Sequence, residues 1–164
     1  FYCDQYSNDN NPLAHYETTG EEILEQLPEI THFVGGVGTG GTISGIGRRL
    51  KEFNPNIQII CVEYDEWPGV EGLKPLGEGH IVPDTFDRSI IDRMIYVDVL
   101  KCYDLSRDLA KKGLFIGQSS GVYLQGAMQI ADEISEGKIA TIFNDIGERY
   151  FSTALWEEPA ALNV

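Results

Sequence analysis

The hydrophobic residues of this chain fall into short continuous runs that alternate with longer amphipathic stretches. One run covers residues 30–34 and a second covers residues 57–63. Runs of this kind, without polar residues at every second position, indicate strands buried on both faces of a sheet. Further strands are predicted at residues 93–97, 114–116 and 138–143, and the last of these is also expected to be buried.

Helical periodicity fills the intervals between the runs. We expect helices over residues 43–53, 99–112 and 122–135, with Asp98 as the N-cap of the second, and helical character around Gly20 that ends at Pro28. Strands that alternate with helices of this length predict an α/β fold. The expected architecture has three layers, with a largely parallel sheet and helices on both of its faces.

Residues 64–87 form the longest stretch without periodicity, and they are rich in glycine and proline. A long irregular segment inside a compact domain is typical of a binding loop or a lid. We therefore expect this segment to contribute to a functional site.

Composition narrows the class of protein. The chain has 164 residues, long enough for one domain with a buried core, and its formal net charge is -14. This charge disfavours nucleic acids and anionic membranes as partners, because both require basic surfaces. No apolar run reaches the roughly 20 residues of a membrane span. Cys3, Cys61 and Cys102 show no metal-binding spacing, so we expect reduced thiols, a cytoplasmic location and no metal site.

The most informative motif lies between the first strand and the first long helix. Residues 35–42 read Gly-Gly-Val-Gly-Thr-Gly-Gly-Thr. A glycine-rich turn that opens a helix can direct backbone N–H groups at a phosphate, which the helix dipole also favours. Thr39 and Thr42 add hydroxyl groups, so the motif predicts a phosphate-binding site.

A dinucleotide is one candidate ligand for this phosphate site. Gly36, Gly38 and Gly41 satisfy the G-x-G-x-x-G pattern, and Glu63 ends the next strand at a distance suited to a ribose-binding acid. The two threonines, however, crowd the path of a pyrophosphate. They suit one compact terminal phosphate better.

A second turn motif resembles the nucleophile elbow of serine hydrolases. Residues 117–121 read Gly-Gln-Ser-Ser-Gly, and Asp145 follows. A histidine would have to follow Asp145 to complete the triad, but His15, His32 and His80 all precede Ser119. A serine without a base is not activated, so a hydrolase is excluded.

Pyridoxal phosphate is a candidate ligand that would contact both turns. Its phosphate would lie on residues 38–42, and the Ser119 hydroxyl would hydrogen-bond the pyridine nitrogen. A neutral partner at that nitrogen favours elimination and replacement at the β-carbon of an amino acid. Taken alone, Ser119 fits an ordinary helix N-cap equally well.

Several segments in the same order carry a family resemblance. They are the Asn-Pro-x-x-His-Tyr-x-Thr-Thr-Gly stretch at 11–20, the glycine loop at 38–48, the segments 70–73 and 81–83, the Gly-x-Ser-Ser-Gly turn at 117–121, and the Gly-Glu-Arg-Tyr-x-Ser-Thr signature at 147–153. Together they resemble the fold-type II pyridoxal-phosphate enzymes, and within these the cysteine synthases, including the B type. The resemblance implies a transferase that replaces the acetate of O-acetylserine with sulfide to give cysteine.

The resemblance also implies the residues of the site. The phosphate contacts would be Gly38, Thr39, Gly40, Gly41 and Thr42, and Ser119 would contact the ring nitrogen. Gln5 would face the substrate carboxylate, and Gly72 and the loop 77–79 would lie near the substrate. Gln118 stands where the family has an apolar residue, and 145–146 also departs from the family sequence.

The Schiff-base lysine of the family lies in its amino-terminal half and has no counterpart here. We therefore expect residues 1–164, which begin without Met, to be the carboxy-terminal, phosphate-binding portion of such an enzyme. No catalytic residue is assigned, and Lys74 is the lysine placed in a loop. The chain alone is expected to be inactive. The resemblance implies that the intact enzyme is a homodimer and that serine acetyltransferase is a partner of it.

Three alternatives stay open at this point. Cystathionine β-synthase and serine/threonine dehydratase share the fold and differ in substrate. A non-catalytic interaction subunit, or one half of a split enzyme, would explain the missing lysine. An NAD-binding domain using the glycines and Glu63 is the third.

Overall fold

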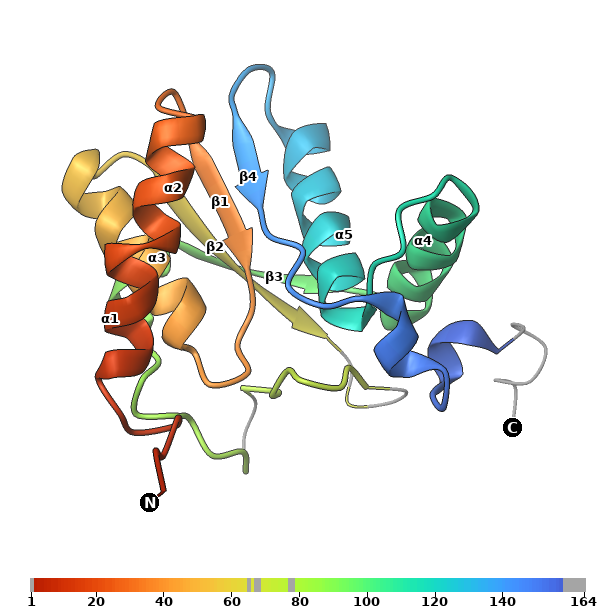
Figure 1. Cartoon of the computed structure of the whole chain (residues 1–164). Helices are drawn as coiled ribbons and strands as arrows, with labels where there is room; N and C mark the ends of the chain where they lie inside the picture. The colour runs from red at the N-terminus through yellow and green to blue at the C-terminus, as the bar shows by residue number, and fades with distance from the viewer. Residues whose placement is uncertain (1, 65, 67–68, 77–78, 158–164) are drawn as a thin grey trace.

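The computed structural model of the protein describes residues 2–64, 66, 69–76 and 79–157. Within them a parallel sheet has the strand order β3-β2-β1-β4 (Figure 1). The strands are β1 (His32–Gly35), β2 (Gln58–Tyr64), β3 (Arg93–Val97) and β4 (Ile139–Thr141). Every pairing between them is parallel, which agrees with the continuous apolar runs of the sequence.

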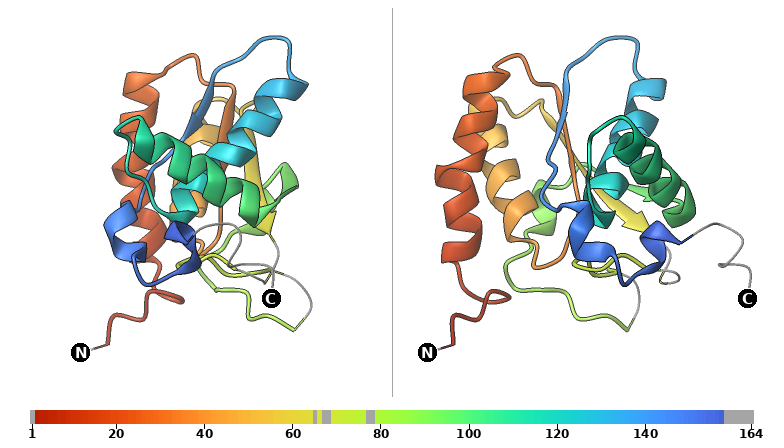
Figure 2. Two further views of the ribbon diagram at one scale, coloured as in Figure 1. Left: turned by 90° about the vertical axis from the view of Figure 1, so that its right-hand side faces the viewer. Right: turned by 45° about the vertical axis from the view of Figure 1, so that its right-hand side comes forward.

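Helices cover both faces of this sheet. The helices α1 (Asn10–Glu17), α2 (Thr19–Gln26) and α3 (Gly41–Phe53) lie on one side, and α4 (Val99–Lys111) and α5 (Gln118–Glu133) lie on the other (Figure 2). Short 3₁₀ turns occur at η1 (Arg88–Ile90), η2 (Gly147–Tyr150) and η3 (Ala154–Trp156). The predicted three-layer α/β fold is confirmed.

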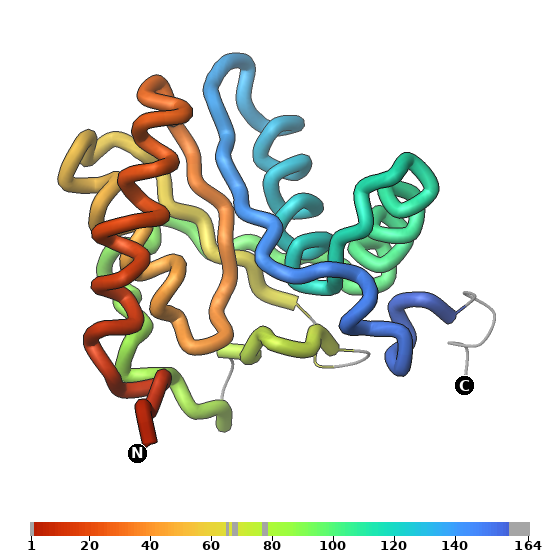
Figure 3. The backbone as a smooth tube through the Cα atoms, in the orientation of Figure 1, coloured from red at the N-terminus to blue at the C-terminus, as the bar shows by residue number. Residues whose placement is uncertain are grey.

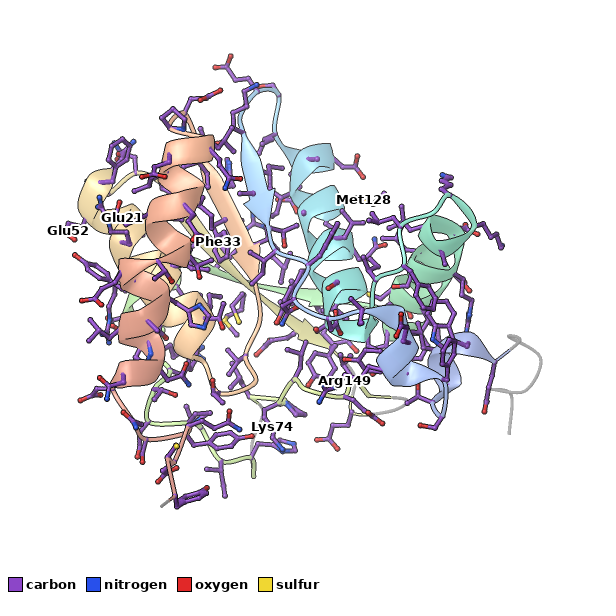
Figure 4. All side chains as sticks on the ribbon, in the orientation of Figure 1. Glu21, Phe33, Glu52, Lys74, Met128 and Arg149 are labelled. Carbon is purple, nitrogen blue, oxygen red and sulfur yellow. The ribbon has the colours of Figure 1, made fainter. Side chains whose placement is uncertain are left out.

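Two separate hydrophobic cores follow from the alternation of side chains along each strand. Phe33 and Ile59 point toward α2 and α3, whereas Val34 and Ile60 point toward α4 and α5. All four side chains are fully buried. The sheet is therefore the middle layer, and Figure 4 labels Phe33 on the side of the sheet where α2 lies.

Helix α1 packs unusually closely on α3. A Cβ atom on Gly45 would overlap the Pro12 carbonyl oxygen and would lie 2.8 Å from the His15 Cβ, and one on Gly41 would overlap the Asn11 side chain. The two glycines are four residues apart, so they lie on the same face of α3. This face lets the backbone of α1 approach the start of α3.

Three of the predicted elements differ from the structure. Residues 114–116 form no strand, since only Ile116 makes an isolated antiparallel bridge, with Ile146. Strand β4 is shorter than predicted and half-buried, because it is an edge strand that pairs with β1 alone. Helix α5 begins at Gln118 rather than at 122, because the Asp145 carboxylate accepts hydrogen bonds from the Ser119 and Ser120 N–H groups of its first turn.

None of the helices among the described residues is long and apolar enough to cross a membrane.

Candidate functional site

The candidate site lies where the carboxyl ends of the parallel strands meet. The glycine loop follows β1, Asn144 and Asp145 follow β4, and the segment 69–76 comes after β2. Figure 3 shows this segment running across the ends of β1 and β2, and the Lys74 N–H donates to the Val37 carbonyl at 2.6 Å. Ligands of parallel α/β sheets bind at this edge.

The glycine loop leaves the start of α3 open toward this edge. Gly40, the N-cap residue of α3, has φ +86°, a conformation that glycine adopts without strain, and it has no side chain to accept from the helix N–H groups. A Cβ atom on Gly38 would overlap the Gly72 carbonyl oxygen, so the loop and the segment 69–76 touch at this point. N–H groups at a helix start whose N-cap is a glycine form a cradle suited to a phosphate.

Both threonines of the loop are held by α1. The Asn11 Nδ2 donates to the Thr39 Oγ1 at 2.9 Å, and the His15 Nε2 lies 3.0 Å from the Thr42 Oγ1. Burial lowers the pKa of His15, so its imidazole is neutral at pH 7. Sequence reasoning did not assign Asn11 or His15 to the site, although their spacing of four residues places them on one face of a helix.

Ser119 lies within α5 rather than at its cap, which is Gly117. Its side chain is buried, and its hydroxyl donates to the Asn144 Oδ1 at 3.2 Å. An ordinary N-cap role is therefore wrong for Ser119. The neighbouring Ser120, and not Ser119, hydrogen-bonds the Asp145 carboxylate through its hydroxyl group, so no Ser–His–Asp arrangement exists among the described residues.

Asp145 fixes the start of α5. Its carboxylate accepts from the Ser119 N–H at 3.0 Å, the Ser120 N–H at 3.0 Å and the Tyr150 hydroxyl at 2.6 Å. Burial acts to raise the pKa of Asp145, but the hydrogen bonds from Ser120, Tyr150 and Ser119 outweigh it and hold the pKa below its ordinary value. The position of Ser119 thus depends on a charged side chain that follows β4.

Gln118 connects three segments. The side chain is 2% exposed, accepts a hydrogen bond from the Glu71 N–H at 2.7 Å and donates to the Thr153 Oγ1 at 3.1 Å. An apolar residue at this position, as in the resembling family, would leave both partners without these bonds. The departure noted in the sequence therefore has a structural role.

The other predicted residues fall near the same edge. The Gln5 carbonyl accepts from the Asn11 Nδ2 at 2.7 Å, which places its backbone beside the glycine loop, and its side chain is exposed. Gly72 lies against Gly38, as described above. Residues 77 and 78 of the predicted substrate loop lie outside the described residues.

The features of a dinucleotide site are present only in part. Glu63 lies near the end of β2 and lines a cavity of about 240 Å³ together with Lys74 and Tyr96. Gly41, the third glycine of the fingerprint, faces Asn11 of α1. In a dinucleotide fold that glycine permits close packing of helix and strand, so its use here differs.

The lysines are distributed as the sequence suggests. Lys51 of α3 and Lys101 and Lys111 of α4 form ion pairs with Asp92, Asp98 and Asp108, respectively. Lys74 lies at the carboxyl edge of the sheet (Figure 4), where it lines a cavity of about 690 Å³ with Tyr6 and His80. Among the described residues, no group of three or more metal-binding side chains comes together.

Residues 1–145 match the family described as "Pyridoxal-phosphate dependent enzyme". The chain belongs to this family. Its cofactor is pyridoxal phosphate, which confirms the predicted cofactor class and resemblance.

Individual relatives refine this assignment. The chain is 48% identical to a cysteine synthase of Aquifex aeolicus over 165 residues, covering 96% of this chain and 50% of that protein. It is similar in structure to a hydrogen sulfide-producing enzyme (TM-score 0.87, 33% identity, 96% of this chain and 51% of the other). It is also similar to an O-acetylserine-dependent cystathionine β-synthase of Helicobacter pylori (TM-score 0.82, 34% identity, 93% and 53%). The chain spans about half the length of the curated relatives that it matches.

Proposed function

We propose that this chain is the carboxy-terminal, phosphate-binding portion of a pyridoxal-phosphate-dependent cysteine synthase. One observation supports this most directly. A helix start whose N-cap is Gly40, opened by Gly38 and flanked by two threonine hydroxyls, lies at the same sheet edge as Ser119. That arrangement offers donors for a phosphate and a neutral partner for a pyridine nitrogen.

The residues of this chain would bind and orient the cofactor. Residues 38–42 would hold its phosphate, and the dipole of α3 would contribute about 1 kcal/mol to that binding. The Ser119 hydroxyl would turn its hydrogen from the Asn144 Oδ1 to the ring nitrogen, with Asp145 fixing the turn that carries Ser119. When bound, pyridoxal phosphate supplies the electron sink for elimination and replacement at the β-carbon. We propose that Gln5 and Gly72 face the amino-acid substrate.

The proposed overall reaction replaces the acetate of O-acetylserine with sulfide. Cystathionine synthesis and hydrogen sulfide production are alternatives that the structural relatives support. The complete enzyme would distinguish them by its preference among sulfide, homocysteine and cysteine as substrates. We further propose a cytoplasmic homodimer, and a chain that has no activity unless another segment supplies the lysine.

The phosphate site can be tested on the chain itself. Pyridoxine 5′-phosphate carries the ring and phosphate of the cofactor but no aldehyde, so it reports this half of the site without covalent chemistry. It should raise the melting temperature, because it binds only the folded chain, while NAD should leave it unchanged. Replacing both Thr39 and Thr42 with Val should weaken its binding about tenfold or more.

The matched control is Thr18→Val, since Thr18 is exposed and lies outside the glycine loop. It should bind pyridoxine 5′-phosphate like the unsubstituted chain. Stabilisation by NAD in place of pyridoxine 5′-phosphate would contradict the proposal and support a dinucleotide site.

A further inference from the structure

Thr39 has its acceptor capacity occupied by the protein. The Asn11 Nδ2 lies 2.7 Å from the Gln5 carbonyl oxygen, and a carbonyl oxygen can only accept. This contact fixes which end of the Asn11 amide is the NH₂ group. The same nitrogen lies 2.9 Å from the Thr39 Oγ1, so its second hydrogen is donated to Thr39.

The Thr39 hydroxyl oxygen also receives the Gly41 N–H at 3.3 Å. Two donors therefore converge on this oxygen, and no acceptor for its own hydrogen occurs among the described residues. The hydrogen is free to point out of the loop, toward the open start of α3. An anion there would receive it as a hydrogen bond.

Thr42 has a corresponding partner on the same helix. The His15 Nε2 lies 3.0 Å from the Thr42 Oγ1, and the His15 Nδ1 lies 3.1 Å from the Thr19 Oγ1. A neutral imidazole has one donor nitrogen and one acceptor nitrogen. If Thr19 donates to Nδ1, then Nε2–H donates to Thr42, and the Thr42 hydroxyl hydrogen is also left for an outside acceptor.

We infer that Asn11 and His15 are positioning residues that turn both loop threonines into hydrogen-bond donors toward the cofactor phosphate. The inference rests on the proposed phosphate site. It adds the residues that make both threonine hydroxyls donors rather than acceptors toward the phosphate. The close packing of α1 on Gly41 and Gly45 supports it, because that packing is what brings the Asn11 amide and the His15 ring to the loop. Neither side chain would touch the phosphate itself.

The decisive variant is Asn11→Asp in the chain as it exists. A carboxylate has the shape of the amide but only accepts, so it would take the Thr39 hydroxyl hydrogen for itself. Helix α1 has no acidic residue in its first turn, where one is favoured, so the variant should fold. We expect its affinity for pyridoxine 5′-phosphate and for inorganic phosphate, measured by calorimetry, to fall about tenfold or more.

Asn10→Asp is the matched control, since Asn10 is exposed and lies next to Asn11 in the same turn of α1. It adds the same charge without reaching Thr39, and its affinity should change less than about threefold. In a Thr39→Val background, Asn11→Asp should cost little further affinity. A loss of equal size in both backgrounds, or in both aspartate variants, would show simple charge repulsion and overturn the inference.

The role of His15 can be read spectroscopically on the unsubstituted chain. Nitrogen-15 NMR of the labelled chain distinguishes a protonated from an unprotonated ring nitrogen, and comparison with His15→Gln assigns the signals of His15. We expect a hydrogen on Nε2 and none on Nδ1 at neutral pH. The opposite tautomer would overturn the inference for Thr42.

The outcomes also separate this inference from the proposed function. If the unsubstituted chain binds neither pyridoxine 5′-phosphate nor inorganic phosphate, the proposed site fails and the inference fails with it. If it binds them and Asn11→Asp binds equally well, only the inference fails.

Discussion

At the scale of single residues, the Asp145 side chain stabilises the start of α5. One carboxylate accepts from two N–H groups of α5 and from the Tyr150 hydroxyl, so it replaces the capping side chain that α5 lacks. Charged acceptors at a helix start are favoured by the helix dipole as well as by hydrogen bonding. These hydrogen bonds hold the turn that carries Ser119 in place.

Asp145→Asn should lower the free energy of unfolding by about 2 kcal/mol or more, because the amide cannot accept all of these bonds. Since folding lowers the pKa of Asp145, its contribution is complete above the ordinary carboxyl pKa and is lost as pH falls through the folded value. Urea unfolding from about pH 7 to about pH 3 should therefore show that the difference in free energy of unfolding between the unsubstituted chain and Asp145→Asn becomes smaller in acid. Asp132→Asn, an exposed change on the same helix, should stay within about 0.5 kcal/mol of the unsubstituted chain at every pH. An Asp145→Asn gap that stayed constant with pH would contradict this assignment.

At the scale of elements, the contact between α1 and α3 depends on glycines rather than on side chains that interlock. The face of α3 that meets α1 carries Gly41 and Gly45, whereas Gly47 meets the end of the Ile90 side chain. A rigid backbone neighbour and a flexible side-chain neighbour should respond differently to an added methyl group.

Gly45→Ala should destabilise the chain by about 1–3 kcal/mol, because its methyl group would overlap the Pro12 carbonyl. Gly47→Ala gains the same helix propensity, and Ile90 can rotate away, so its cost should be smaller by about 1 kcal/mol or more. Chemical denaturation of the two variants measures the difference directly. Equal stability of both would mean that α1 is free to move off α3.

At the scale of the whole molecule, the sequence predicted the architecture well because strands β1, β2 and β3 are signalled by local apolar runs. It placed the start of α5 wrongly, because the acceptors that extend that helix come from Asp145, far along the chain. The roles of Asn11 and His15 were also missed, since they arise only when α1 packs on α3. Patterns within one element were visible in the sequence, and pairings between elements were not.

Gln118 is the clearest such pairing, since it joins α5, the segment 69–76 and the region after η2. Gln118→Leu should leave the Glu71 N–H without its buried acceptor and raise its hydrogen-exchange rate about tenfold or more. Gln129 lies on the same helix as Gln118, and Gln129→Leu removes an exposed bond to the Tyr96 carbonyl of β3, so it should leave the Glu71 exchange rate unchanged. Unchanged exchange in Gln118→Leu would mean that the segment 69–76 is held by other contacts.

The contacts at the glycine loop and at Ser119 join residues that are close in the sequence, unlike the pairing of β1 with β4. Asn11 and Thr39 are 28 residues apart and Ser119 and Asn144 are 25 apart, whereas the β1–β4 contact between Thr141 and Val34 spans 107 residues. Contacts over short loops form sooner than those over long ones. During synthesis, the contact of Asn11 with Thr39 can therefore form before the ribosome has added Ser119. Of these three contacts, the pairing of β4 with β1 closes the longest separation, so we expect it to form last.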